Sequence, residues 1–239
     1  MNLRVLLVTT ILIKLTAAFK NPKFRQFQEI SEKLSNPRLA ICITGVSNSG
    51  KTYFANIIQN VLKSNFQVET EIVHQDYFFM PIDITPVEIL KFNNSESENP
   101  IIYPRFEEVL SYDWTGLWEY ASNVVKKERN NRVVIIEGSI ILQAKRAFKL
   151  CDRVFEIKVD FETALKRRQA RKDYADMYMT RRDYVRDITW VEHAKYMEIA
   201  EILAGQSGKE IVKIRETEIT AAQNDGDIVE FVLNLLFLK

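Results

Sequence analysis

The sequence predicts a three-layer α/β fold, in which helices cover both faces of a parallel sheet. Short apolar runs alternate with segments of helical periodicity along most of the chain, which is typical of strand–helix–strand units. The length of 239 residues suits one such domain, or at most two small ones. A glycine-rich turn at residues 45–52 stands between an apolar run and a helical segment.

The first half of the chain is predicted to contain two strands and their flanking helices. Apolar residues at spacings of three and four predict an amphipathic helix over residues 21–36. The run LAICIT at residues 39–44 predicts a buried strand, which is followed by a helix at about 51–63 and a strand at 67–74. Residues 80–111 contain four prolines and a polar tract. A stretch this long inside a compact domain is expected to be an irregular, functional loop.

The second half continues the alternation and ends on a helix. A helix is predicted at 113–127, and the run RVVIIE at 132–137 predicts a strand that ends at Gly138. The remaining predicted elements, in chain order, are a strand at 152–159, a basic helix at 161–172, a helix at 188–203, a strand at 210–214 and a closing helix at 227–238.

The first 38 residues are predicted to precede the domain, which covers residues 39–239. Residues 1–18 begin with positive charge, continue with an apolar stretch and end on small residues, a pattern typical of a secretory signal peptide. Lys14 interrupts the apolar stretch. The alternatives are an apolar helix against the domain or a wrongly chosen start codon. The stretch is far shorter than the ~20 residues that span a bilayer, so we expect no membrane partner.

Composition and charge exclude several functions. The 33 basic and 32 acidic residues give a net charge of +1, which excludes attraction to nucleic acid or acidic membranes by bulk charge. The two cysteines, Cys42 and Cys151, are too few for a disulfide framework. Cys42 falls in an apolar run and is expected to be a small buried hydrophobic residue. With two histidines as well, the chain offers few ligands for zinc.

The turn at residues 45–52 matches the phosphate-binding pattern GxxxxGK[ST]. Its glycines let successive backbone N–H groups point at phosphate oxygens, and the following helix adds its positive end. Lys51 is expected to reach the β- and γ-phosphates of a nucleoside triphosphate, and the Thr52 hydroxyl to ligate Mg²⁺. The alternative is a chance match on a surface turn. The predicted nucleotide-binding residues are Gly45, Val46, Ser47, Asn48, Ser49, Gly50, Lys51 and Thr52.

A carboxylate follows the next predicted strand. In an open parallel sheet the ligand lies at the carboxyl ends of the strands, so Asp76 is expected to point toward the γ-phosphate. There it would accept a proton from an attacking hydroxyl or support Mg²⁺. The alternative is an ordinary polar residue at the start of a loop. The adjacent Tyr77, Phe78 and Phe79 are either core residues or a wall for a flat ring.

Taken in order, the stretches ITGVSNSGKT, HQDYFFMP, SYDW, VVIIEG and ALKRRQAR resemble the nicotinamide riboside kinases, which belong to the uridine kinase-like branch of small-molecule kinases. The resemblance covers about residues 39–203. It implies a P-loop kinase fold with a basic helical lid. It also implies transfer of the γ-phosphate of ATP, with Mg²⁺, to the 5′-hydroxyl of nicotinamide riboside for NAD synthesis. Nicotinic acid riboside is a second candidate acceptor.

The resemblance assigns roles to individual residues. It makes Asp76 the general base, with Lys51 as the other catalytic residue, and places Glu137 and Asp76 near the metal with Thr52. It makes Asp113, after Tyr112, the carboxylate that holds the ribose hydroxyls. It also implies a lid in which Arg167 and Arg171 contact the nucleotide while Arg168 contacts the substrate.

Two features depart from the family pattern. The segment between Phe79 and Tyr112 is longer than expected, which affects acceptor choice. Asp173 takes the place of an aromatic residue, so Tyr174 is the candidate for contact with the base. Phe78, Phe79 and Tyr112 are further candidates for packing on a cationic pyridinium ring.

Each assignment has a plainer alternative. Asp113 also suits the start of a helix, and Glu137 the start of a loop. The basic stretch 166–172 also suits a solvated helix face or, without aromatic residues between the charges, a poor nucleic-acid site. The alternative functions are a uridine/cytidine kinase, a P-loop protein that binds ATP without catalysis, and a degenerate kinase fold. No pattern indicates the oligomeric state. The use of MgATP and two cysteines without an evident need for oxidation favour the cytoplasm.

Overall fold

In the computed structural model, the described residues are 38–81, 83, 87–90, 101–104, 106–126, 132–172, 178–222 and 225–238. The predicted helix at 21–36, the signal-like segment and Tyr174 lie outside these residues.

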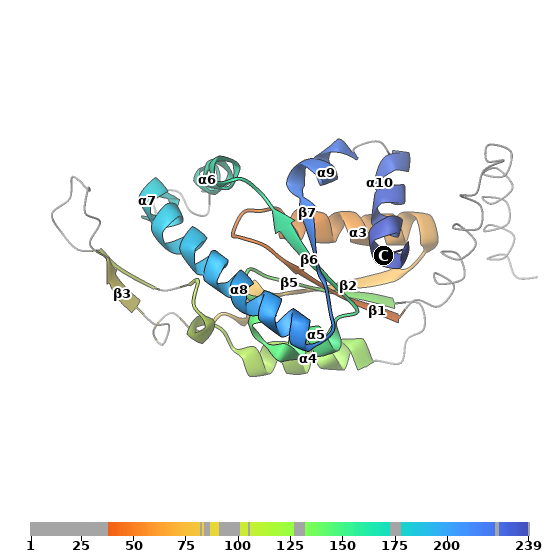
Figure 1. The fold of residues 1–239 in the computed structure, drawn as a ribbon, viewed down its shortest axis with the longest axis horizontal. Coiled ribbons are helices and arrows are strands. Elements are labelled where there is room, and N and C mark those ends of the chain that lie inside the picture. Colours follow the sequence, from red (N-terminus) through yellow and green to blue (C-terminus); the bar gives the residue numbers. More distant parts are fainter. Residues whose placement is uncertain are drawn as a thin grey trace, which may run out of the picture.

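The core of the fold is a five-stranded parallel sheet with the order β2-β5-β1-β6-β7 (Figure 1). The central strand β1 pairs with β5 on one side and with β6 on the other. All five strands were predicted from the sequence, with ends that differ by up to two residues. Their bounds are β1 Arg38–Thr44, β2 Glu69–His74, β5 Arg132–Glu137, β6 Arg153–Lys158 and β7 Ile211–Arg215.

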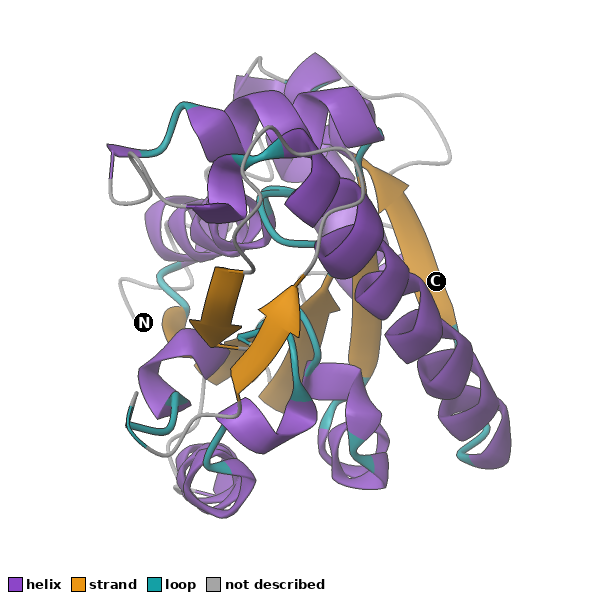
Figure 2. Cartoon of the chain, turned by 90° about the vertical axis from the view of Figure 1, so that its left-hand side faces the viewer, coloured by secondary structure: helices purple, strands orange, loops and turns teal. Residues whose placement is uncertain are grey.

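Helices cover both faces of the sheet, so the predicted three-layer architecture is confirmed (Figures 1 and 2). One face packs against α3 (Lys51–Phe66), α9 (Glu216–Ala221) and α10 (Asp225–Leu233). The other packs against α4 (Trp114–Lys126), α5 (Lys145–Leu150) and α8 (Val191–Gln206). The side chains of β1 alternate between these cores, since Ile41 and Ile43 contribute to the first and Cys42 to the second.

A third group of elements lies beyond the carboxyl ends of the strands. It contains α6 (Phe161–Gln169), α7 (Arg182–Tyr184) and a π-helical turn, Val185–Trp190, that leads into α8. A small separate core of Leu165, Met179, Tyr184 and Val185 holds the group together. The position matches the predicted basic lid, although α6 ends three residues earlier than expected.

Residues 80–111 are more regular than the sequence predicted. Strands β3 (Val87–Leu90) and β4 (Ile101–Pro104) form an antiparallel pair outside the main sheet. The prolines and the polar tract of this segment predict an irregular loop. Pro104 nonetheless stands at the end of β4, a position that tolerates the missing N–H.

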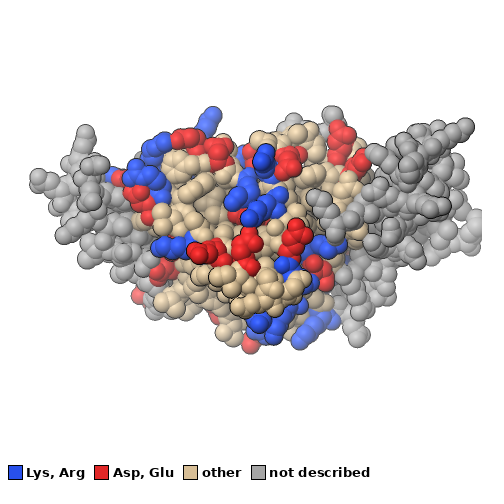
Figure 3. Space-filling view, viewed as in Figure 1, with Lys and Arg blue, Asp and Glu red and all other residues tan. Residues whose placement is uncertain are grey.

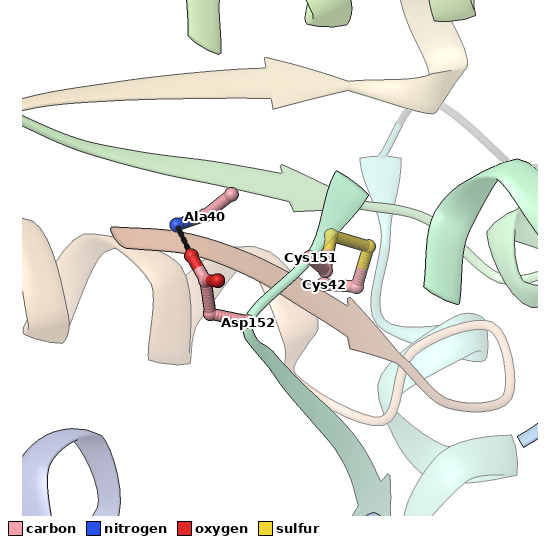
Figure 4. Close-up of a disulfide and its surroundings, with 4 residues drawn as sticks. All are labelled: Ala40, Cys42, Cys151 and Asp152. Carbon is pink, nitrogen blue, oxygen red and sulfur yellow. Dashed lines mark hydrogen bonds between the residues drawn. A yellow bond between two sulfur atoms is a disulfide. The ribbon is translucent and has the colours of Figure 1, made fainter. Parts of the chain in front are cut away.

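The two cysteines form a disulfide, which corrects the expectation that Cys42 is simply a buried apolar residue (Figure 4). Cys42 lies on β1, and Cys151 lies two residues before β6, the strand beside β1 in the sheet. Beside the bond, the Ala40 amide donates to Asp152 Oδ2 at 2.9 Å, and the Asp152 amide donates to the Ala40 carbonyl at 2.7 Å. Because the two cysteines are 109 residues apart in the sequence, their contact could not be predicted from it.

The surface agrees with the balanced composition. On the face shown in Figure 3, acidic and basic side chains are intermixed over the described residues. None of the helices in the described part of the chain combines the length and the apolar character needed to cross a bilayer.

Candidate active site

The loop between β1 and α3 has the backbone that its sequence predicts. Gly45 and Gly50 have φ angles of +149° and +100°, which favour glycine, and Asn48 is also left-handed at +65°. A Cβ atom at Gly45 would lie 2.6 Å from Ser49 Oγ and 2.7 Å from the Ile157 carbonyl oxygen of β6. The loop therefore has no room for a side chain at Gly45. Gly45 and Ser49 form its inner part, because Ser49 is fully buried.

Lys51 begins α3 and is held in the loop. Its ammonium donates to the carbonyl oxygens of Gly45 and Val46, at 3.1 Å each. Burial lowers the pKa of Lys51, and the charges of Glu137 and Asp76 oppose this effect. A desolvated cation at the start of a helix, beside a glycine-rich loop, is well placed to bind the oxygens of a polyphosphate.

Glu137 ends β5 close to Thr52. Thr52 Oγ1 donates to Glu137 Oε1 at 3.0 Å, and His74 Nδ1 donates to the same oxygen at 2.6 Å. Burial alone would raise the pKa of Glu137. The hydrogen bond with His74 and the charge of Lys51 outweigh burial, so this pKa lies below its usual value. The hydrogen bond to Glu137 raises the pKa of His74 in turn.

Asp76 lies two residues beyond β2, in the 3-10 turn Gln75–Phe78, and lines the same cavity. Desolvation raises the pKa of its carboxyl group, with Lys51 acting against this and Glu137 adding to it. A carboxylate with a raised pKa is a stronger proton acceptor, which suits a general base. The structure thus brings together Asp76, Glu137, Lys51 and Thr52, as the sequence predicted.

The oxygen atoms of Thr52, Glu137 and Asp76 are of the kind that Mg²⁺ prefers. Their side chains line one cavity, and Thr52 and Glu137 already contact each other. Within the described residues no group of three or more His, Cys, Asp or Glu gathers as a metal site. Two carboxylates and a hydroxyl nonetheless suit an ion that keeps several waters and binds substrate phosphates.

These residues line a cavity of about 480 Å³ at the carboxyl ends of the strands. Such a volume falls in the range of sites for small molecules and cofactors. Its walls come from the phosphate loop, the segments after β2 and β5, the lid and the start of α8. Its lining includes Val46, Ser47, Asn48, Gly50, Lys51, Thr52, Asp76, Glu137, Ser139, Ile140, Arg167, Arg168, Arg171, Glu192, His193 and Tyr196.

Aromatic side chains form one wall of this cavity. Phe79 and Tyr112 stack with ring centroids 4.3 Å apart, and Phe106 meets Phe79 edge-on at 5.7 Å. The other two predicted aromatic residues lie elsewhere. Tyr77 is 81% exposed and Phe78 packs toward α4, so neither lines the cavity. Tyr77 and Phe78 lie in the 3-10 turn Gln75–Phe78 and Phe79 directly follows it, so the three side chains point in different directions and, of the three, Phe79 lines the cavity.

Asp113 does not line the cavity, which counts against its predicted role at the ribose hydroxyls. The residue immediately precedes α4, and its Oδ1 accepts the Gly116 N–H at 2.9 Å. This is the geometry of a helix N-cap. The plainer alternative, a helix-terminal acid, describes its observed position.

The three lid arginines differ in their surroundings, although all line the cavity. Arg167 pairs with Glu216 at the start of α9. Arg168 is 2% exposed and donates to Thr189 Oγ1 at 3.0 Å and to Glu107 Oε1 at 3.2 Å. It is therefore part of a buried network. Arg171 is exposed at the cavity mouth.

Glu107 is the centre of that network, and sequence reasoning missed it. Its carboxylate also accepts hydrogen bonds from Thr189 at 2.9 Å and from the Tyr184 hydroxyl at 2.7 Å. These contacts join the segment before α4 to the lid. Glu107 belongs to no recognisable motif, and nothing in the sequence marks it as a partner of Arg168.

Four further residues of the site were not predicted from the sequence: Glu192, His193 and Tyr196, which line the cavity, and His74, which contacts Glu137. His74 was available as a signal, since it ends a predicted strand two residues before Asp76. The other three lie on the first turns of α8, and only the fold shows that this helix begins beside the cavity.

No protein-family model matches the chain, and no curated protein matches it in sequence. Solved structures are similar. A protein from Silicibacter sp. TM1040, proposed to be a fructose transport system kinase, has a TM-score of 0.51 and 16% identity, covering 72% of this chain and 91% of that one. Shikimate kinase from Acinetobacter baumannii, solved with shikimate, has a TM-score of 0.39 and 14% identity, covering 87% and 96%. The first match and the sheet described above show that the chain has the three-layer α/β fold of P-loop kinases.

Proposed function

We propose that this protein is an ATP- and Mg²⁺-dependent small-molecule kinase whose acceptor is the 5′-hydroxyl of nicotinamide riboside. One observation carries the proposal. A complete phosphate loop, a carboxylate with a raised pKa and a stacked aromatic wall all face one cavity. The phosphate loop and the carboxylate are the groups that phosphoryl transfer needs, and the aromatic wall suits the binding of a flat, cationic ring.

The nucleotide phosphates would bind the backbone N–H groups of residues 45–50 and the Lys51 ammonium. Binding would replace the carbonyl contacts that Lys51 now makes within its own loop. Thr52, Glu137 and Asp76 would hold Mg²⁺, which supplies charge neutralisation at the phosphates. Arg171, at the cavity mouth, adds positive charge beside the transferring group.

Asp76 would accept the proton of the attacking hydroxyl. Its raised pKa favours this role, and Lys51 keeps the carboxyl ionised enough to perform it. The stacked Phe79 and Tyr112 would bind the acceptor ring beside it. The lid, tied to Glu107 through Arg168, would exclude water that otherwise hydrolyses ATP.

The resemblance of residues 39–203 to nicotinamide riboside kinases supports the choice of acceptor. The kinase name of the Silicibacter protein supports phosphoryl transfer in general. The exclusion of Asp113 from the cavity removes one argument for ribose, so uridine, cytidine and a sugar belong among the tested acceptors. The product of the proposed reaction is a mononucleotide that feeds NAD synthesis. The Cys42–Cys151 disulfide removes the cysteine argument for the cytoplasm, so the location that we propose, the cytoplasm, rests on the use of MgATP alone.

The test is ADP release from MgATP with nicotinamide riboside, nicotinic acid riboside, uridine, cytidine, adenosine and fructose. We expect turnover with the pyridine ribosides and a loss of about 10²–10⁴-fold in Asp76→Asn. Asp83→Asn, an exposed residue outside the cavity lining, is the matched control and should behave as wild type. Turnover with uridine or cytidine alone would overturn the proposed choice of nicotinamide riboside as acceptor. ATP binding without turnover of any acceptor would overturn the proposal that the protein is a kinase.

A further inference from the structure

His193 lies on the first turn of α8 and takes no part in the mechanism above. With Glu192 and Tyr196 it forms the wall of the cavity nearest to Ser139 and Ile140. Gln143 Nε2 donates to the Tyr196 carbonyl at 2.7 Å, which fixes this turn of α8 against the segment that follows β5. The ring of His193 is therefore held at the cavity wall on the β6 side of the site, beside Glu156.

A buried carboxylate orients the imidazole. His193 Nε2 lies 3.4 Å from Oε1 of Glu156, whose side chain is 1% exposed. Glu156 sits on β6 opposite Thr44, the residue before the phosphate loop, and also accepts from Lys158 at 3.0 Å. A carboxylate that contacts one ring nitrogen sets both the orientation and the tautomer of a histidine.

The other ring nitrogen has no partner within the described part of the chain. His193 Nδ1 is buried and makes no hydrogen bond there. Burial lowers the pKa of His193, and Glu156 only partly opposes this, so the ring is neutral near pH 7. The proton then resides on Nε2, facing Glu156, because a carboxylate can only accept. Nδ1 is left as a hydrogen-bond acceptor without a donor.

We propose that His193 is a substrate-binding residue whose Nδ1 accepts a hydrogen bond from a hydroxyl or amide N–H of the acceptor substrate. This inference rests on the proposed function. Phosphate oxygens are acceptors, so the nucleotide phosphates cannot satisfy a neutral Nδ1. A riboside offers donors of the required kind, namely its ribose hydroxyls and, in nicotinamide riboside, the carboxamide N–H. Since Asp113 lies outside the cavity lining, hydroxyl recognition requires another group such as this one.

Two substitutions separate the two nitrogens. His193→Gln places an amide nitrogen near the position of Nε2, so it keeps a donor for Glu156 and loses Nδ1. His193→Asn places an amide oxygen near the position of Nδ1, so it keeps the acceptor and loses the contact with Glu156. We expect His193→Gln to raise KM for the riboside about ten-fold, with KM for ATP unchanged, and His193→Asn to raise it less. Glu198→Gln, on the exposed face of α8, is the matched control.

A comparison of two riboside substrates shows which of their groups donates the hydrogen bond to Nδ1. An equal loss with nicotinamide and nicotinic acid ribosides assigns the bond to a ribose hydroxyl. A loss confined to nicotinamide riboside assigns it to the carboxamide, because nicotinic acid riboside carries a carboxylate in its place. Either result supports the inference. A larger effect of Asn than of Gln would overturn it, since that order describes a purely structural partner of Glu156.

A measurement without turnover completes the test. The chain has two histidines, so ¹⁵N-histidine labelling gives two ring systems, and the His193→Gln spectrum identifies the second. We expect the riboside to shift the Nδ1 resonance of a neutral His193. If the enzyme phosphorylates a riboside but that riboside leaves the Nδ1 resonance unchanged, the inference about His193 is overturned and the proposed function is not. A wild-type enzyme that neither binds nor phosphorylates any riboside would overturn both the inference and the proposed function.

Discussion

Removal of the Cys42–Cys151 disulfide should destabilise the protein strongly. The bond closes a loop with a sequence separation of 109 residues. A cross-link over ~100 residues reduces the entropy of the unfolded chain by the equivalent of about 4.7 kcal/mol. Typical domains are stable by only about 5–15 kcal/mol, so this is a large fraction of the total. With an m-value near 2 kcal/mol/M, the midpoint in urea should fall by roughly 2 M.

The assay is urea unfolding of oxidised wild-type protein, reduced wild-type protein and the double variant Cys42→Ala/Cys151→Ala. Both cysteines are in the bond, so no other thiol interferes. Refolding with oxidised glutathione prepares the oxidised protein. Titration of thiols in the denatured state then shows whether the disulfide has formed. The double variant should not respond to reductant. Two free thiols after oxidative refolding, or superimposable unfolding curves for oxidised and reduced wild type, would refute the reasoning.

Three further predictions concern individual positions. Asp113→Ala should lose about 0.5–2 kcal/mol of stability as a lost N-cap, while Asp113→Asn keeps stability and neither changes the acceptor KM. Gly45→Ala should abolish ATP binding in an isothermal titration, whereas Gly205→Ala, with open space around its Cβ position, should leave it intact. Because burial lowers the pKa of His193, wild type should gain stability over His193→Gln as pH rises from about 5 to 7, and a flat difference between their unfolding free energies would contradict this.

The parts of the fold that could be predicted are those whose signal is local. Each strand of the main sheet is a short apolar run, and alternation with helices sets its parallel direction. The phosphate loop is equally local, because Gly45 and Gly50 occupy the positions where the backbone requires glycine. Asp76 followed from one general rule, that ligands lie at the carboxyl ends of parallel strands.

The parts that could not be predicted depend on contacts between distant segments. The disulfide joins residues that become neighbours only when β1 and β6 pair. The hydrogen bond between Glu107 and Arg168 joins the two sides of the cavity. Neither residue lies in a sequence pattern that predicts the other as its partner. Asp113 shows a different difficulty. Its sequence context fitted both a family motif and a helix N-cap, and only the structure shows which of the two describes its position.

The central place of β1 in the sheet has a consequence for how the protein is made. The strand that carries the phosphate loop is synthesised before both strands that flank it, because Arg38 pairs with Arg132 on one side and Ile41 with Arg153 on the other. Until β6 has left the ribosome, at least one edge of β1 is an unpaired apolar template. Sheets with such distant pairings fold slowly and are exposed to aggregation meanwhile. Nucleotide binding is thus gained late in biosynthesis, when most of the domain has emerged.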